Sequence, residues 1–193
     1  MNRLDRPKVD YRPQRILLSG TSGSGKTTLA RRLAAALDLP HTGLDALFHG
    51  PDWTPRPTFV TEVEALAAQD RWVTEWQYAT VRRQLAARAD LVVWLDLPRR
   101  TVMRCVVSRT VRRRLRRTEL WNGNIEPPFR RILTDREYIV RWAWTTYHLT
   151  AERTMALAAQ RPELPIVRLR RFAEYDRWLA GPAASALSGD SGG

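Results

Sequence analysis

The sequence predicts an α/β fold in which helices cover a parallel β-sheet on both sides. Short aliphatic runs alternate with longer segments whose apolar residues recur every three or four positions, a pattern typical of strand–helix–strand units. The run at 90–98, DLVVWLDLP, is almost continuously apolar, as expected of a strand buried on both faces. A glycine-rich stretch, GTSGSGKT, stands between the first aliphatic run and the first helical segment.

Five short segments have the composition of strands, and they predict a five-stranded sheet. In chain order these segments are 15–19, 41–45, 71–76, 90–96 and 165–170. The second is the shortest, and it precedes a proline-rich loop with the sequence GPDWTPRP.

Helices are predicted wherever the apolar period is close to 3.6 residues. Leu29, Leu33 and Leu37 form one such stripe, and Thr134 with Glu137 has the spacing of a capping box that opens a long helix. The expected helices cover 26–39, 59–67, 80–89, 99–117, about 134–160 and 172–180.

The 193 residues suit one domain with short extensions at both ends. Residues 1–14 are rich in arginine and proline and are expected to form a flexible arm, whereas 181–193 are small and polar and are expected to be a disordered tail. The α/β domain then occupies 15–180.

The composition excludes several classes of protein. The single cysteine, Cys105, cannot form an internal disulfide, and no apolar run is long enough for a membrane span or a secretory signal. A cytoplasmic location without a membrane partner is therefore expected. The net charge is +12, and thirteen arginines against four acidic residues between Arg99 and Arg141 give that stretch +9. Such a surface favours polyanionic partners, either nucleotides or nucleic acid.

The glycine-rich stretch matches the phosphate-binding pattern G-x-x-x-x-G-K-[ST] at every specified position. Glycines allow successive backbone N–H groups to turn toward phosphate oxygens, and the following helix adds its positive N-terminal dipole. Gly23 and Gly25 are expected to have unusual backbone angles. Lys26 is expected to reach the β- and γ-phosphates and Thr27 to bind Mg²⁺. The predicted nucleotide-binding residues here are Gly20, Thr21, Ser22, Gly23, Ser24, Gly25, Lys26, Thr27 and Thr28.

This motif predicts a nucleoside triphosphate site rather than a dinucleotide site. The dinucleotide pattern G-x-G-x-x-G fails, because Thr28 stands where its third glycine belongs. Only two of the 32 basic residues are lysines, Lys8 and Lys26, and one of them occupies the position at which this loop requires lysine.

Three acidic residues at predicted strand ends are candidates for the remaining chemistry. Glu75 or Asp96 can hold Mg²⁺ beside the phosphate loop, and Glu75 is favoured if its strand lies next to the first strand. Either can instead cap a helix or pair with an arginine. Asp45 faces the same edge of the sheet and can orient or deprotonate an acceptor hydroxyl, although a turn aspartate is an equal alternative.

The sequence resembles the adenylate-kinase-like P-loop NTPases, and more closely the bacterial group of DNA topology modulation proteins. The segments that carry the resemblance are ILLSGTSGSGKTTLARRLA, LDALFHGPDWTPRP, RWVTEWQY, ADLVVWLDLPRRTVMRCVVSRTVRRRLRR and ELWNGN. The resemblance implies a three-layer nucleoside-monophosphate-kinase fold with strand order 2-3-1-4-5, an acceptor-binding insertion at about 46–70 and a helical lid at about 104–134. It also implies ATP with Mg²⁺ as cofactor.

By the same resemblance, Arg109 is the lid arginine that acts in catalysis with Lys26 and Asp45. Arg104 and Arg113 are further nucleotide-binding candidates, and Arg112 is another nearby arginine. Two departures leave the acceptor open. Related sequences carry Asp-Gly-Asn-Tyr where this chain has Glu-Trp-Gln-Tyr at 75–78, and the acceptor motif Gly-Phe-Pro-Arg is absent.

Three functions are compatible with this sequence. The first is a phosphotransferase that moves the γ-phosphoryl group of ATP to a nucleotide or another small acceptor, with Trp53 as a candidate platform for a ring unless it packs its own loop. The second is an ATPase that binds nucleic acid through the nine arginines between 99 and 117. The third is a kinase for a small metabolite such as a sugar. The sequence does not predict an oligomeric state.

Overall fold

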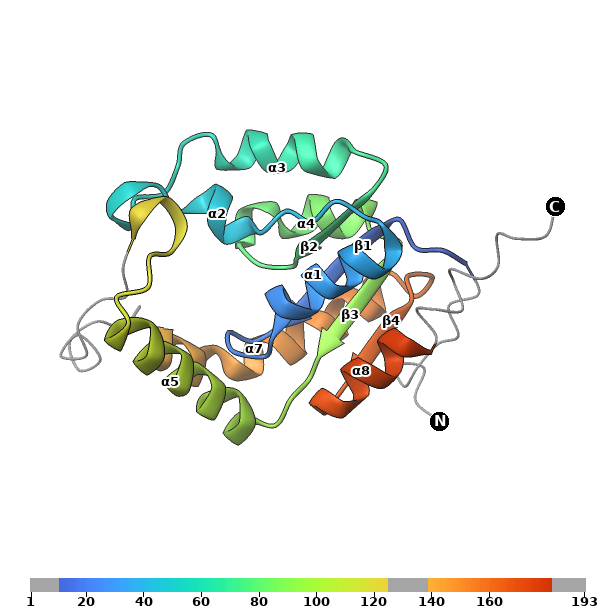
Figure 1. Ribbon diagram of the computed structural model, residues 1–193. Coiled ribbons are helices and arrows are strands. Elements are labelled where there is room, and N and C mark those ends of the chain that lie inside the picture. Colours follow the sequence, from blue (N-terminus) through green and yellow to red (C-terminus); the bar gives the residue numbers. More distant parts are fainter. Residues whose placement is uncertain (1–10, 125–138, 182–193) are drawn as a thin grey trace.

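The computed structural model describes residues 11–124 and 139–181, which form a parallel four-stranded sheet between two layers of helices (Figure 1). The strands are β1 (Arg15–Gly20), β2 (Trp72–Glu75), β3 (Leu91–Leu95) and β4 (Ile166–Leu169), in the order β2-β1-β3-β4. All three strand pairs are parallel, so the carboxyl ends of the strands meet at one edge.

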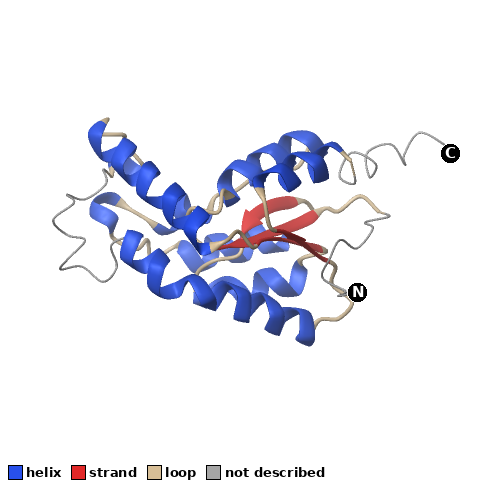
Figure 2. Ribbon diagram, turned by 90° about the horizontal axis from the view of Figure 1, so that it is seen from below, coloured by secondary structure: helices blue, strands red, loops and turns tan. Residues whose placement is uncertain are grey.

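Alternate residues of the strands face two separate hydrophobic cores. Ile16 and Leu18 of β1 face α1 (Lys26–Leu37) and α8 (Phe172–Ala180). Leu17 faces the opposite layer, which contains α3 (Phe59–Ala68), α4 (Ala79–Arg88) and the C-terminal part of α7 (Ile139–Gln160). Figure 2 shows the sheet between these two layers. The α/β, parallel, three-layer prediction is thereby confirmed.

The prediction of five strands is wrong for the described residues, because the segment 41–45 does not form a strand. A single parallel bridge joins His41 to Val73 of β2, flanked by hydrogen bonds from the Val73 amide to Pro40 and from the Thr42 amide to Val73. The chain then turns at Gly43 into the short helix α2 (Leu44–Phe48). The observed order is the predicted 2-3-1-4-5 without its edge strand, whose place is held by that bridge.

The other predicted elements that fall on described residues are present. The arginine-rich segment forms α5 (Arg99–Leu115). Two short 3₁₀ turns are also present: η1 (Pro51–Trp53) lies within the proline-rich loop, and η2 (Trp121–Gly123) follows α5. The expected capping box at Thr134 and Glu137 lies outside the described residues, as do 1–10, 125–133 and the tail after 181. None of the described helices is both long and apolar enough to cross a membrane.

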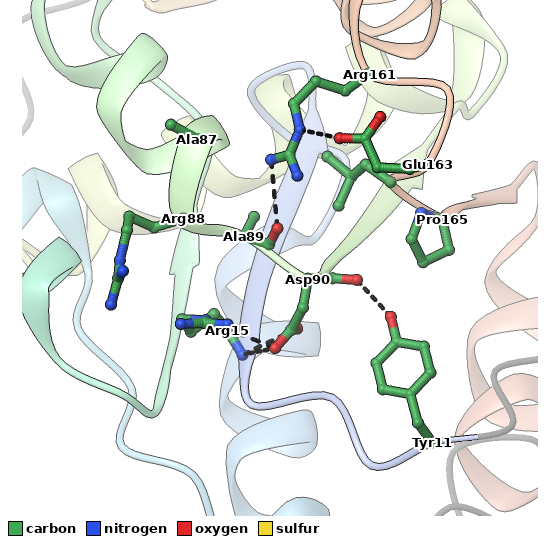
Figure 3. Close-up of a pocket in the computed structure, with 10 residues that line it drawn as sticks. Tyr11, Arg15, Ala87, Arg88, Ala89, Asp90, Arg161, Glu163 and Pro165 are labelled. Atoms are coloured by element: carbon green, nitrogen blue, oxygen red, sulfur yellow. Dashed lines mark hydrogen bonds and ion pairs between the residues drawn. The ribbon is translucent and has the colours of Figure 1, made fainter.

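A pocket of about 390 Å³ lies at the amino ends of the strands, away from the phosphate loop (Figure 3). Its polar groups largely contact one another. The Tyr11 hydroxyl donates to the Asp90 carbonyl, the Asp90 carboxylate accepts the Arg15 amide at 3.0 Å, and Arg161 donates to Glu163 at 2.7 Å. These contacts hold residues 11–15 against the sheet, so the last part of the expected arm is attached here. We therefore interpret this pocket as structural.

Candidate active site

The phosphate loop connects β1 to α1 at the carboxyl edge of the sheet. Gly23 and Gly25 have φ of +86° and +89°, the left-handed region that favours glycine, as the sequence predicted. A Cβ atom on Gly23 would lie 2.3 Å from the Cγ2 atom of Val106 on α5. The loop therefore requires glycine at 23 for two reasons, the backbone angle and the close approach of α5.

We predict that Gly23→Ala lowers the free energy of unfolding, whereas Gly43→Ala leaves it unchanged. Gly43 has φ of −81°, and its nearest neighbour would be 4.0 Å from an added Cβ, so it is a matched control. The Gly23 variant must strain its backbone and displace α5, at a cost of about 1–3 kcal/mol in the free energy of unfolding. Urea denaturation of the two variants measures this difference. Equal stabilities would contradict the described contact between the loop and α5.

Lys26 lies over the phosphate loop at the start of α1. Its ammonium group donates to the carbonyl oxygens of Gly20 at 2.7 Å and Thr21 at 3.2 Å. Burial lowers the pKa of Lys26 to about 8, although the nearby carboxylates of Asp45 and Glu75 act in the opposite direction. Two of the three acidic residues singled out in the sequence, Asp45 and Glu75, are thus close enough to act on the Lys26 charge.

This lowered pKa predicts that nucleotide binding takes up protons at alkaline pH. Above a pKa of about 8 the free protein increasingly holds Lys26 neutral, whereas a bound triphosphate favours the ammonium form. The affinity for MgATP should therefore fall as the pH rises above this value, by up to about tenfold per pH unit. Titration calorimetry at about pH 8.5, in buffers of different ionisation enthalpy, measures the uptake. Lys26→Gln should show no proton uptake on binding. Equal uptake in that variant and in wild type would mean that another group takes up the proton.

Asp45 lies on α2 rather than at a strand end, and two side chains of the loop after β2 hold it. Its Oδ1 atom accepts hydrogen bonds from the Gln77 side-chain amide at 2.7 Å and from the Tyr78 hydroxyl at 2.6 Å. Tyr78 has φ of +60°, unusual for a residue with a side chain, and its ring stacks on Phe48 with centroids 4.2 Å apart. Burial, followed by the charge of Asp45, raises the pKa of Tyr78 well above its ordinary value, which keeps the hydroxyl a donor.

Sequence reasoning missed Gln77 and Tyr78 as site residues. Their position two and three residues after Glu75, just past the carboxyl end of a strand beside β1, was the available signal. Their strained turn and their contact with α2 could not be predicted from sequence.

The two candidate magnesium ligands, Glu75 and Asp96, have different surroundings in the structure. Glu75 is buried beside β1, with its Oε2 atom accepting the Leu44 amide at 3.3 Å and its Oε1 atom 3.7 Å from His41. Burial acts to raise the pKa of Glu75, but His41, the Leu44 amide and Lys26 outweigh this and keep it below the ordinary value. Asp96 instead accepts a hydrogen bond from Arg168 at 2.8 Å. This is the pairing with an arginine that the sequence left open as the alternative to a magnesium role.

A magnesium ion fits this site only as part of a nucleotide complex. No cluster of three or more His, Cys, Asp or Glu side chains able to hold a metal occurs among the described residues. Mg²⁺ bound to a nucleotide needs few protein ligands, because phosphates and waters supply the rest. Thr27, exposed in the first turn of α1, and Glu75, ionised and close enough to act on Lys26, meet that need.

Three arginines of α5, namely Arg104, Arg109 and Arg112, lie near the phosphate loop. Arg109 donates to the Ser22 hydroxyl at 3.1 Å. A pocket of about 560 Å³ opens beside the loop, and Arg104 and Arg112 line it, but Arg113 does not. Its other lining residues are Gly23, Gly25, Thr28, Thr101, Cys105, Ser108, Arg109 and Phe172. Phe172, the first residue of α8, was not predicted from sequence. An aromatic residue three positions after the last strand was the signal for it.

Trp53 packs against two other aromatic rings. Its ring contacts His49, just before its loop, and Trp121 of η2, with centroids 5.1 and 6.3 Å away. Its ring partners therefore lie outside its own loop, and its role as a stacking platform stays a prediction.

Comparison with known proteins gives similarity at the level of the fold. No family model matches the chain, and no curated protein matches it. Among solved structures, a gluconokinase from Sinorhizobium meliloti 1021 is 19% identical over 92% of this chain and 94% of its own, with a TM-score of 0.52. The chain has the fold of a P-loop kinase.

Two shikimate kinases are also similar in structure. The one from Aquifex aeolicus vf5 is 15% identical over 90% of this chain and 99% of its own, with a TM-score of 0.48. The one from Bacteroides thetaiotaomicron is 16% identical over 87% and 95%, with a TM-score of 0.47. The resemblance to DNA topology modulation proteins stays a prediction.

Proposed function

We propose that this protein is a kinase that transfers the γ-phosphoryl group of MgATP to a hydroxyl group of a small acceptor. The observation that carries the proposal is the pairing of a complete phosphate loop with Asp45. The Asp45 carboxylate is close enough to act on the Lys26 ammonium and is held by two neutral donors, Gln77 and Tyr78. Lys26 belongs to the nucleotide side of such a reaction and Asp45 to the acceptor side.

The nucleotide half of the site lies between the phosphate loop and α5. The loop amides, Lys26 and Arg109 take the triphosphate, and Thr27 with Glu75 takes Mg²⁺, directly or through water. The base and ribose fit the pocket of about 560 Å³ beside the loop, between Arg104 and Phe172. Bound Mg²⁺ supplies charge neutralisation at the phosphates.

In the proposed reaction Asp45 accepts the proton of the acceptor hydroxyl. The acceptor oxygen forms a bond to the γ-phosphorus, and the bond from that phosphorus to the β,γ-bridging oxygen breaks, which releases ADP. Lys26 and Arg109 offset the negative charge on the transferring group. Gln77 and Tyr78 fix one carboxylate oxygen of Asp45, so that the other can point toward the acceptor.

The charges near Asp45 favour a hydroxyl acceptor over a phosphate acceptor. Gln77 and Tyr78 are neutral, and burial lowers the pKa of His49, so this ring also tends to be neutral. Arg56, in the acceptor-side insertion, donates to Glu62 at 3.2 Å and to the Leu47 carbonyl at 3.4 Å. A nucleoside monophosphate needs cations for its phosphate, and this part of the described chain commits its arginine elsewhere.

The test is phosphoryl transfer from γ-labelled MgATP to a panel of polyols, hydroxy acids and nucleoside monophosphates. We expect a labelled polyol or hydroxy acid. A labelled nucleoside monophosphate would keep the kinase assignment but contradict the acceptor class. Release of phosphate alone, faster with duplex DNA, would replace the kinase with a nucleic-acid-dependent ATPase.

A further inference from the structure

Two asparagines bind the acceptor-side segment 49–53: Asn122, which is part of η2, and Asn124, which directly follows η2. The Asn124 side chain accepts the Trp53 amide at 2.9 Å and donates to the carbonyls of Gly50 at 2.8 Å and Trp121 at 2.7 Å. The Asn122 side chain donates to the carbonyl of His49. The two segments, coloured cyan and yellow in Figure 1, lie side by side although 71 to 74 residues separate the bonded pairs. We call these contacts the asparagine clasp.

Asn124 is the centre of the clasp because it uses both ends of its amide. It is only 5% exposed, so a lost partner would leave buried polar groups without water to replace it. Its oxygen faces an N–H group and its nitrogen faces two carbonyls. Aspartate keeps the acceptor and loses both donors, whereas alanine loses all three bonds. No other residue type of similar size meets this pattern.

Three rings cover the clasp. The His49 and Trp121 rings are nearly parallel, with centroids 5.8 Å apart, and the edge of Trp53 contacts both. The rings and the asparagine bonds therefore fix the same two turns.

The clasp joins the two halves of the proposed site. On one side, its chain continues from α5, which contacts the phosphate loop through Arg109 and lines the nucleotide pocket. On the other side, His49 Nε2 lies 3.4 Å from the Tyr78 hydroxyl, and this hydroxyl donates to Asp45. These contacts connect the segment that follows α5 to the residues that hold Asp45.

We infer that Asn124 is a positioning residue through which nucleotide bound against α5 orders the acceptor-side segment 49–53. The nucleotide part of this inference depends on the proposed function, whereas the clasp itself does not.

Hydrogen exchange tests both parts, because the Trp53 amide is itself one of the bonded groups. The variants are Asn124→Asp and Asn124→Ala, with Gln160→Glu as an amide-to-carboxylate control at the end of α7. In the free protein, exchange in 49–54 should be about tenfold faster in both Asn124 variants, with β1 unchanged. Asn124→Ala removes the acceptor of the Trp53 amide. Asn124→Asp keeps that acceptor, but its carboxylate would face the carbonyls of Gly50 and Trp121 and so destabilise both turns. With Mg²⁺ and the non-hydrolysable analogue β,γ-imido-ATP, exchange in 49–54 should slow in wild type and in the control. Asn124→Asp should bind the analogue about as tightly as wild type but lose this slowing.

Each outcome decides one part. Unchanged exchange throughout 49–54 in both free Asn124 variants would overturn the clasp. Equal slowing in wild type and Asn124→Asp would overturn the coupling and leave the clasp. Failure of wild type to bind the analogue would remove the proposed function together with the coupling, while the comparison of the free proteins would still decide the clasp. If Asn124→Ala unfolds, Asn124→Asp supplies both comparisons.

Discussion

Lys26→Ala is expected to lose phosphoryl transfer, by about 10³-fold, and to weaken MgATP binding by about 10- to 100-fold. The ammonium group lies over the loop carbonyls of Gly20 and Thr21, where it can reach the β- and γ-phosphates. Transfer suffers more than binding, because negative charge shifts toward the leaving oxygen as the reaction proceeds. Rapid-quench assays with γ-labelled ATP, together with calorimetric binding, separate the two effects.

The matched control for Lys26→Ala is Lys8→Ala, which removes the only other lysine of the chain at a position outside the described residues. It should behave as wild type. Full turnover in Lys26→Ala would mean that the phosphate loop is not the site of the chemistry.

Asp45→Asn should have the second largest effect, a loss of about 10²- to 10⁴-fold in transfer with little change in MgATP affinity. The amide cannot accept the proton of the acceptor hydroxyl. Gln77 and Tyr78 can still donate to its oxygen, so the local structure should persist. The loss should appear in kcat rather than in the KM for ATP, as expected for a group that acts on the acceptor.

Asp70→Asn is the control for this variant. Asp70 is exposed after α3, and its substitution removes the same negative charge away from the site. It should retain full transfer. A parallel loss of ATP affinity in Asp45→Asn alone would place Asp45 on the nucleotide side instead.

The fold could largely be predicted because its strands and helices have strong local signals. The phosphate loop, the buried strand β3 and the stripe of leucines on α1 each determine their structure within a few residues. The segment 41–45 was misjudged because its end is decided by a distant partner. The buried carboxylate of Glu75 accepts the Leu44 amide at the beginning of α2, and this contact is not visible in the local pattern.

The arginines of α5 show why the site was harder to predict than the fold. The helix carries two possible apolar stripes, one through Val102 and Val106 and one through Val107 and Val111, and arginines lie near both. The structure buries the first stripe and leaves Val107 and Val111 43% and 38% exposed. With α5 oriented in this way about its own axis, Arg112 rather than Arg113 lines the nucleotide pocket. Packing against the phosphate loop determines this orientation of α5. Val106 lies so close to Gly23 that a Cβ atom on Gly23 would collide with it.

The most direct test of the account is the fate of the γ-phosphoryl label in wild type and in Asp45→Asn, measured across the acceptor panel. The account predicts that wild type places the label on a hydroxyl of a polyol or hydroxy acid, and that Asp45→Asn binds ATP but forms almost none of this product. A wild type that releases the label only as inorganic phosphate, at the same rate in Asp45→Asn, would contradict the assignment of this site as a kinase.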